Sequence, residues 1–431
     1  MAEVVYDNLP DTQTQQINHE MTKIKEYTTR TLDSYKKSTR KRRGGQQGFQ
    51  IPFYVSDYGQ NSYLKPGPTG NSFVQPVPPE SKSMWVGLAY PGKAMYTDGI
   101  FMASMETEAS LINNMELRQL AIENYFKHMN YYAIGDNFGY GILGVVSSVS
   151  GGVLTCTTAA QTTSGYTKGA HRLLKNVVYD VVDESTFQVV GTVKPTQDGI
   201  YSATVPVETT GSPNNSGAFI VEQGAFFAVP RGTNFLINNV DREFQGIDTT
   251  DYAEFNSSFV DLNGSAVTSA TINTLKTKVQ IRMATPGKEF GRVGHLTPGQ
   301  YNTLAIQGFG ARQYQAAEGQ ADTTYGYPEI YKDGPIGWVQ DPDFDEDRLM
   351  LRRADDYFMF ELKEFGSVNR DGLTLRQAPG DNNVGAEAWF EQVEHFYNLG
   401  FDGGGKPGAG NGASAFVMRA QVTNSQVNVL S

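Results

Sequence analysis

The strongest hydrophobic pattern in the chain lies at residues 105–135. Apolar side chains recur there at spacings of three or four residues or their sums, which is the period of one helix face. They are Met105, Ala109, Ile112, Met115, Ile122, Phe126 and Met129. Gly135 can end the pattern in a left-handed conformation. We therefore predict a helix of about 25 to 30 residues, roughly 40 Å long at 1.5 Å per residue, which needs a partner surface of similar length.

A thinner apolar stripe at residues 14–35 precedes a basic run. A helix with so few apolar side chains gains little stability alone, so we expect it to dock on another surface. The basic residues are Lys36, Lys37, Arg40, Lys41, Arg42 and Arg43. This run indicates either an arm that meets DNA or an acidic neighbour, or a solvated segment before a hinge at Gly44 and Gly45.

Strand-like alternation marks both ends of residues 46–97. The alternating apolar residues are Phe49, Ile51, Phe53 and Val55 at the first end and Met84, Val86 and Leu88 at the second. Trp85 falls on the opposite side of the second strand. Prolines and glycines between the two ends, including Pro76, Pro78 and Pro79, predict turns. We expect a long two-stranded excursion that a neighbouring subunit covers, because an isolated hairpin is marginal in water.

Residues 145–235 contain short valine-rich runs separated by glycine, serine and threonine turns, which predict a β-rich subdomain or insertion. A G-x-G-x-x-G motif at residues 139–144 comes just before them. A dinucleotide-binding fingerprint needs a strand before the glycines and a helix after them. The predicted order here is the reverse, so we expect no cofactor at this motif.

The remainder of the chain mixes helical and strand patterns. Thr268 can cap one helix, and Thr297 followed by Pro298 can start a second that Gly308 can end. The later apolar patterns predict strands at 336–339, 349–351 and 357–365, a helix at 384–397, and a last strand from Phe416.

Composition bounds the class of protein. The 431 residues are 39% hydrophobic, which is enough for a substantial core and about two or three subdomains. The net charge is −11, and because residues 1–43 are net basic by three, the rest of the chain carries −14. Such an acidic body argues against a nucleic-acid groove, which needs clustered basic side chains. Cys156 is the one cysteine and cannot form an internal disulfide, and no segment resembles a signal peptide or a membrane span.

The candidates for chemistry are few. The acidic loop at 341–347 begins like a calcium-binding EF-hand, but Glu346 stands where the loop needs glycine and Arg352 where it needs a bidentate glutamate. We expect a solvated turn or a partner for a basic patch on another subunit. The five histidines show no metal-binding spacing, and His295 is expected to be a hydrogen-bonded structural residue. We predict no catalytic, cofactor or metal-binding residue.

An enzyme that uses paired carboxylates is the alternative among catalysts. Asp355 and Asp356 adjoin a predicted strand, but adjacent residues on a strand point to opposite faces and do not form such a pair.

The order of these parts resembles the major capsid proteins of tailed bacteriophages, which have the Hong Kong 97 (Johnson) fold. The similar stretches follow the helical arm and the hairpin. They are the long helix with Gly-Tyr-Gly at 139–141, residues 268–275, residues 292–304 and residues 337–343. The resemblance implies an α+β fold divided into five parts. These are an N-terminal arm (1–45), an extended hairpin loop (46–97), a long spine helix with the start of the peripheral domain (98–144), a β-rich subdomain or insertion (145–235), and an axial domain with returning peripheral strands (236–431).

The same resemblance implies a structural function in a virion. The chain would self-assemble as hexamers and pentamers into an icosahedral shell enclosing double-stranded DNA, without sequence-specific binding, a membrane or a cofactor. Scaffolding, portal and decoration proteins would be partners, and assembly would occur in the host cytoplasm. A β-rich virion accessory or receptor-binding protein, and a cellular nanocompartment shell of the same fold, are the alternatives. The candidate contacts between subunits are Lys36, Lys37, Arg40, Lys41, Arg42, Arg43, Phe53, Tyr63, Lys65, Phe73, Lys82, Trp85, Asp341, Asp343 and Asp345.

Overall fold

The fold combines helices and strands, so the predicted α+β class is confirmed. The computed structural model describes residues 29–40, 48–54, 81–98, 108–157, 169–199, 203–282, 292–315, 336–367, 375–377, 388–402 and 414–418. The arm before residue 29, the hairpin tip and most of the 401–412 glycine loop fall outside these ranges. So do the contact candidates Lys41, Arg42, Arg43, Tyr63, Lys65 and Phe73. No helix in the described ranges is long and apolar enough to span a membrane.

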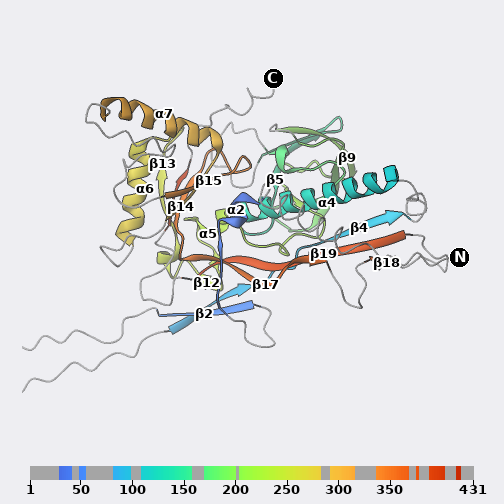
Figure 1. The fold of residues 1–431 in the computed structure, drawn as a ribbon, viewed down its shortest axis with the longest axis horizontal. Coiled ribbons are helices and arrows are strands. Elements are labelled where there is room, and N and C mark those ends of the chain that lie inside the picture. The colour runs from blue at the N-terminus through green and yellow to red at the C-terminus, as the bar shows by residue number, and fades with distance from the viewer. Residues whose placement is uncertain are drawn as a thin grey trace, which may run out of the picture.

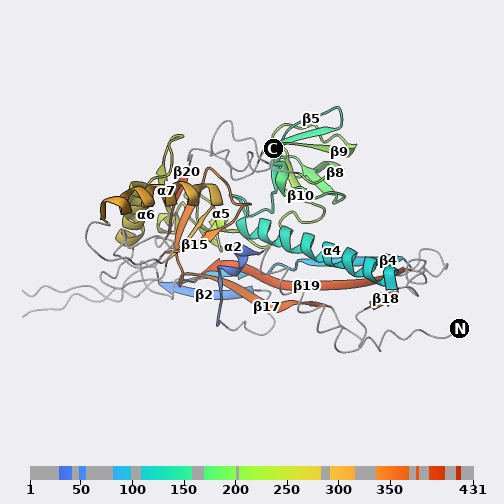
Figure 2. The ribbon, with the colours of Figure 1, turned by 45° about the horizontal axis from the view of Figure 1, so that its top comes forward.

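The predicted long helix is present as α4, Glu108–Ile134, with 27 residues. Gly135 follows it with a φ of +72°, as its position after the pattern predicts. The described part of its apolar stripe is buried, and Phe126 packs against Phe365 with ring centroids 4.7 Å apart. Phe365 belongs to strand β17, Tyr357–Ser367, so α4 lies along a sheet (Figures 1 and 2).

That sheet is built around β19, Ala388–Phe401. On one side β19 pairs antiparallel with β17 and with the short β18, Leu375–Gln377; on the other it pairs with β4, Gly92–Asp98. Strand β1, Lys36–Lys37, extends the sheet parallel to β17. The long helix therefore has the long partner surface that its apolar stripe requires.

The helix predicted at residues 384–397 is wrong, because this segment forms most of β19. Successive residues of a strand point to opposite faces. One face of β19 is buried at Val393, His395, Tyr397, Leu399 and Phe401, and the other face is buried in part, at Glu394 and Asn398. Aromatic and β-branched side chains favour the extended conformation, and the pairing with two neighbouring strands fixes it.

The base of the hairpin forms as predicted. Strand β2, Gly48–Tyr54, pairs antiparallel with β3, Ser81–Gly87. Trp85 is 38% exposed, whereas Ile51 and Met84 are buried in the main core. The expectation that a neighbouring subunit covers this segment is therefore wrong for its base, which packs on the chain's own sheet.

The base of the arm is also covered by its own chain. Leu32, in the short helix α2, Arg30–Asp33, and the following Tyr35 both belong to the main core. These side chains are too few for a separate core, but they complete one that the rest of the chain supplies.

The β-rich region closes into a six-stranded barrel. Its strands, in the order β10-β5-β6-β9-β8-β7, are β10 (Phe219–Glu222), β5 (Gly144–Ser150), β6 (Val153–Thr157), β9 (Thr204–Gly211), β8 (Val189–Pro195) and β7 (Tyr179–Val182). Tyr131 and Tyr132 of α4 reach into the barrel core. The barrel therefore sits on the C-terminal end of the long helix (Figure 2).

A second five-stranded sheet has the order β13-β20-β16-β14-β15. Its strands are β13 (Ser258–Asp261), β20 (Ser414–Met418), β16 (Leu349–Arg353), β14 (Arg292–Leu296) and β15 (Ile336–Gln340). Helix α6, Ser269–Arg282, and helix α7, Pro298–Gln315, supply apolar side chains to the same core. The short elements β11 (Glu243–Phe244), β12 (Ile247–Asp248), α5 (Thr233–Leu236), η3 (Ala170–Arg172) and η4 (Ala253–Phe255) connect these parts.

Both predicted helix starts are confirmed. The Thr268 hydroxyl accepts the N–H of Thr271 at 3.3 Å, and the Thr297 hydroxyl accepts the N–H of Gln300 at 3.3 Å. Gln300 Oε1 in turn accepts the N–H of Thr297 at 3.1 Å, which completes a capping box. The end predicted at Gly308 is wrong, because α7 continues to Gln315. An interior glycine weakens a helix by only about 1 kcal/mol and does not by itself end it.

Replacing Ile51, which is fully buried in β2, tests whether the hairpin base belongs to the chain's own core. Ile51→Ala should lower the free energy of unfolding of the purified chain by about 2 to 5 kcal/mol, because it leaves a cavity. Val189→Ala, at a site 56% exposed on β8, is the control and should change it by less than about 0.5 kcal/mol. Urea unfolding measures both. Equally small effects would mean that only a neighbouring subunit completes the packing around Ile51.

Candidate functional site: a buried polar junction

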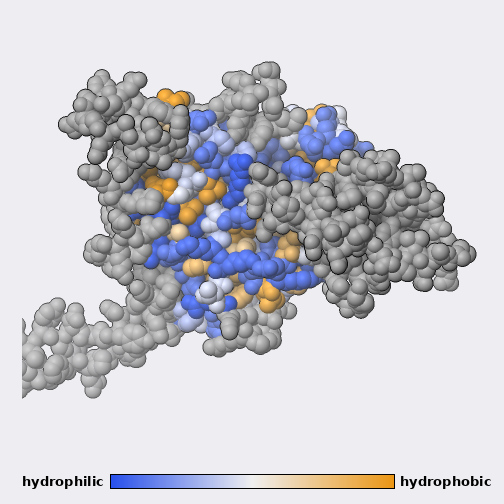
Figure 3. Space-filling model, viewed as in Figure 1, coloured by the Kyte–Doolittle hydropathy of each residue, from blue (hydrophilic) through white to orange (hydrophobic). Residues whose placement is uncertain are grey.

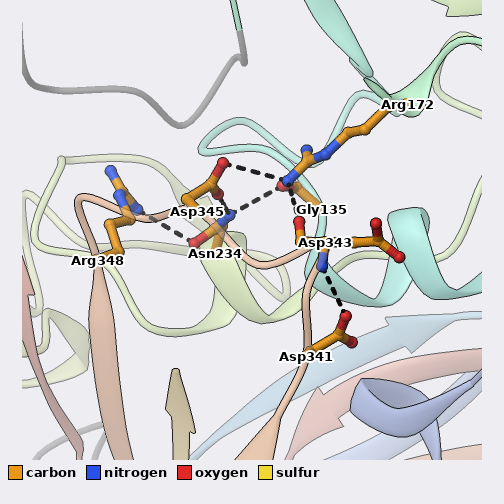
Figure 4. Close-up of polar contacts among 7 residues, drawn as sticks. All are labelled: Gly135, Arg172, Asn234, Asp341, Asp343, Asp345 and Arg348. Atoms are coloured by element: carbon orange, nitrogen blue, oxygen red, sulfur yellow. Dashed lines mark hydrogen bonds and ion pairs between the residues drawn. The ribbon is translucent and has the colours of Figure 1, made fainter. Parts of the chain in front are cut away.

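The acidic loop between β15 and β16 lies at the centre of the molecule rather than in solvent. Asp341 and Asp345 are each 1% exposed, so the prediction of a solvated turn is wrong for them. Asp343 is partly exposed. Figure 4 shows side chains from several elements converging on this loop. We call residues 341–347 and their partners the polar junction.

Asp341 joins the arm to the long helix. Its Oδ2 accepts hydrogen bonds from the Thr31 hydroxyl at 2.6 Å and from Asn130 Nδ2 at 2.8 Å. Asn130 Oδ1 in turn accepts the backbone N–H of Thr31 at 3.1 Å. The other carboxylate oxygen of Asp341 accepts the N–H of Asp343 at 3.0 Å, which shapes the loop (Figure 4). One buried carboxylate thus holds three segments together.

Asp345 joins the barrel side of the molecule to α5. Its Oδ1 accepts a bond from Arg172 Nη2 at 3.2 Å, and both side chains are fully buried. Its Oδ2 accepts a bond from Asn234 Nδ2 at 2.8 Å. The same amide nitrogen donates to the carbonyl of Gly135 at 3.0 Å, and Asn234 Oδ1 accepts a bond from Arg348 at 3.3 Å (Figure 4).

The backbone approach that allows these bonds requires glycine. A Cβ on Gly232, which precedes α5, would lie 2.4 Å from the Cα of Gly135. Such contacts are sterically forbidden, so α5 can reach the end of α4 only because both positions lack a side chain.

A second polar link ties the barrel to α4. Glu222 of β10 contacts His128 Nδ1 at 3.0 Å and accepts the Tyr132 hydroxyl at 2.9 Å. Burial alone would raise the pKa of Glu222, but His128, Tyr132 and Lys93 together lower it to about 2. The carboxylate is therefore ionised, and both contacts are made by its Oε2. A cavity of about 390 Å³ lies beside this link.

The glycine motif at 139–144 is shaped by Asp136. Its buried carboxylate accepts the backbone N–H groups of five residues, Phe138, Gly139, Tyr140, Gly141 and Ile142, at 2.6 to 3.3 Å. Backbone N–H groups of a glycine loop are what would hold a phosphate. Here these N–H groups already bind Asp136.

His295 is a structural residue, as its sequence context predicted. It is fully buried, and its Nε2 accepts a bond from Arg352 Nε at 3.1 Å. Burial and the neighbouring guanidinium lower the pKa of His295 well below its usual range, so the ring is neutral. Arg352 also donates to the carbonyl of Ser34 at 2.9 Å and lies over the Tyr35 ring at 4.0 Å. This contact fastens the arm to β16.

The described basic residues of the arm pair within the chain. Lys36 contacts Asp355 at 2.7 Å, Lys37 contacts Glu361 at 2.6 Å, and Arg40 forms an ion pair with Asp402. The acidic neighbour of this part of the basic run is thus the chain's own sheet. Asp355 and Asp356 lie in the turn between β16 and β17 rather than on a strand, and they contact different partners, Lys36 and Arg353.

Among the other described contact candidates, Lys82 lies over the ring of Tyr252 and forms a hydrogen bond with its hydroxyl. Trp85 faces a cleft, and the backbone of Phe53 lies in β2. Asp341 and Asp345 are enclosed by this chain's own residues and do not fit a contact with another subunit.

Sequence reasoning missed most of the polar junction. Its missed members are Thr31, Asn130, Arg172, Asn234 and Arg348. No spacing in the sequence brings them together, because the partners come from distant segments.

The chemistry of these groups is structural. Within the described ranges, no three histidine, cysteine, aspartate or glutamate side chains are arranged to hold a metal ion. Burial raises the pKa of Cys156 to about 12, so its thiol is not a ready nucleophile. The junction's carboxylates bind donors that position the arm, the barrel and both sheets.

Removing the carboxylate of Asp345 tests the junction's contribution to stability. Asp345→Ala leaves the Arg172 guanidinium buried without its ion-pair partner and should lower the free energy of unfolding by about 3 to 5 kcal/mol. Asp355→Ala breaks an exposed ion pair and should change it by less than about 1 kcal/mol. Guanidinium unfolding compares the two variants. A small effect of Asp345→Ala would show that the Arg172–Asp345 ion pair contributes little to the stability of the junction.

Asp343 gives the junction a pH dependence. Partial burial, and then the nearby Asp341, raise the pKa of Asp343 from 3.8 to about 7. The folded state therefore holds this proton more tightly than the unfolded chain, and stability falls as the pH rises from about 4 to 7. Asp343→Asn should remove that part of the decline and stabilise the chain at pH 7.5 by about 1 kcal/mol, after discounting for solvent screening.

Thermal unfolding of both proteins between pH 4 and pH 8 measures the difference. Burial also raises the pKa of Asp356, to about 6. Asp356 is present in both proteins, so its contribution to the pH dependence cancels in the comparison. Parallel stability curves across this range would contradict the role assigned to Asp343.

Comparisons with known proteins find no matching family model and no matching curated protein. Solved structures that match include the capsid of cyanophage Pam1, with 11% identity, a TM-score of 0.39 and coverage of 88% of this chain and 86% of that one. The capsid of Myoviridae phage XM1 is 8% identical, with a TM-score of 0.43 and coverage of 91% of each chain. The capsid of cyanophage P-SCSP1u is 9% identical, with a TM-score of 0.39 and coverage of 89% of each chain. These are phage capsids, the class that the sequence resemblance indicated. At these TM-scores the likeness carries no conclusion about function.

Proposed function

We propose that the chain is the major capsid (head) protein of a tailed bacteriophage and assembles into an icosahedral shell around double-stranded DNA. The observation that carries the proposal is the long, thin layer formed by α4 and the β19 sheet (Figure 2). A helix of 27 residues extends about 40 Å, and a strand of 14 residues extends about 46 Å. A layer of this shape suits a subunit that tiles a surface.

Strand edges and mixed surface chemistry support contacts between copies. Within the described part of the chain, β13 and β15 stand at the edges of the second sheet. Edge strands present unpaired backbone donors and acceptors that another chain can use. Figure 3 shows a described surface that is mostly hydrophilic, with separate hydrophobic patches between the polar regions.

Charge supports a container rather than a DNA-binding protein. The chain has a net charge of −11, and Lys36, Lys37 and Arg40 of the arm are paired with its own carboxylates. Tight binding of duplex DNA needs clustered cations that release counterions. A shell with this charge encloses DNA without adhering strongly to it.

The proposal assigns a place to each part. The α4 layer corresponds to a peripheral domain, the sheet with α6 and α7 to an axial domain at capsomer centres, and the barrel to an insertion. The hairpin and arm beyond their buried bases make contacts within hexamers and pentamers. Scaffolding, portal and decoration proteins are the expected partners, with assembly in the host cytoplasm and a final place in the virion.

Assembly of the purified chain tests this function. Sedimentation and negative-stain imaging over rising protein concentration, with and without a co-expressed scaffold, should show closed shells of uniform size. Shells filled with DNA should protect it from nuclease, whereas dispersed subunits should not shift duplex DNA at physiological salt. Monomers that stay dispersed under every condition would contradict assembly into a shell. Tight DNA binding by dispersed subunits would contradict enclosure of DNA without strong adhesion.

A further inference from the structure

An open cleft of about 810 Å³ lies between the end of β3 and the base of the barrel. Aromatic side chains line both of its sides and are unusually exposed. They are Trp85 at 38%, Tyr90 at 50%, Phe138 at 45% and Phe227 at 59%. Large aromatic rings usually gain free energy by burial, so several exposed rings around one cleft mark a binding surface.

The backbone holds one of these rings in place against its own preference. Phe227 has a φ of +61°, a left-handed conformation that is rare for a bulky residue. Its N–H donates to the carbonyl of Tyr140 at 3.1 Å, and its ring packs against the rings of Tyr140 and Phe226 at 4.5 and 4.3 Å. Backbone strain of this kind persists where the surrounding structure enforces it, and it clusters at functional sites.

We propose that this cleft binds the proline-rich segment 75–79 from a second copy of the chain, an inference that rests on the proposed shell function. The segment reads Gln-Pro-Val-Pro-Pro. Proline-rich sequences adopt an extended polyproline helix that loses little entropy on binding and docks into grooves lined by aromatic rings. The cleft supplies such rings on both of its sides.

The geometry of β3 favours a second copy over the same chain. Pro79 lies two residues before β3, which begins at Ser81 and runs toward the cleft. Trp85 is therefore about 13 Å beyond Ser81 along the strand. To enter its own cleft, the segment would have to reverse direction within two residues and then run back along the whole strand. A segment from another copy meets no such constraint.

Charge on the cleft is compatible with this ligand. The guanidinium groups of Arg231 and Arg242 lie over the Phe235 ring at 4.7 and 5.3 Å. Burial lowers the pKa of both, which shows that water solvates these cations poorly. Glu80 follows the prolines directly and offers a carboxylate. The cleft's own carboxylates, Asp241 and Glu243, are exposed to solvent.

A peptide titration tests the proposal on dispersed full-length subunits. Pro76, Pro78 and Pro79 are first replaced by alanine, so that the chain carries no competing segment. The variant is then titrated with a peptide of residues 73–80, and binding is measured by calorimetry. We expect saturable binding, and no binding of a peptide with the same three prolines replaced by alanine.

A matched pair of variants locates the site. Phe227→Ala removes a ring that lines the cleft and should weaken peptide binding at least about tenfold, or about 1.4 kcal/mol. Phe187→Ala is the control, because Phe187 is 45% exposed, has a φ of +55° and contacts the Phe227 ring, but does not line the cleft. It should leave the affinity within about twofold. Circular dichroism confirms that both variants fold.

Three results would overturn the proposal: absence of saturable binding, equal binding of the alanine peptide, or equal loss in the two phenylalanine variants. The outcome is separable from the proposed function. If shells assemble but the peptide does not bind, the proposed binding site is wrong and the proposed shell function is unaffected. If the peptide binds but the chain never assembles, the proposed shell function is wrong instead.

Discussion

The need to pair buried charge constrains the whole arrangement of this protein. Asp341 and Asp345 lie where five segments meet, and neither carboxylate is tolerated there without donors. Thr31 and Asn130 satisfy the first, and Arg172 and Asn234 satisfy the second. Moving the arm, the barrel or α5 would leave a buried charge unpaired. Apolar packing around α4 supplies much of the stability, but the polar junction selects one relative placement of the parts.

Local features of the fold could be predicted from the sequence. The long helix, both capped helices and the strands at the hairpin base follow from periodicity and from cap residues such as Thr297, which act within one or two turns. His295 was also identified as structural. These predictions hold because the physical causes, side-chain period and hydroxyl capping, lie in neighbouring residues.

Features that depend on distant partners could not be predicted. Residues 388–401 satisfy both a helical and a strand pattern, and only pairing with β4 and β17 decides between them. The acidic loop looked solvated because carboxylates usually are, while Arg172 lies 173 residues from its partner Asp345. No local sequence pattern indicates such a pair. The buried bases of the arm and hairpin were missed for the same reason, since their cover comes from the sheet.

Ion pairing inside the chain determines which side chains remain available for the contacts between copies that we propose. Lys36, Lys37 and Arg40 of the arm already pair with the chain's own carboxylates, and Asp341 and Asp345 of the junction are buried. The exposed groups around the cleft are mainly aromatic. Aromatic burial is largely insensitive to salt, whereas exposed ion pairs are screened. In the shell that we propose, such a subunit orders itself by electrostatics and meets its neighbours largely by apolar contact, which keeps the two processes chemically separate.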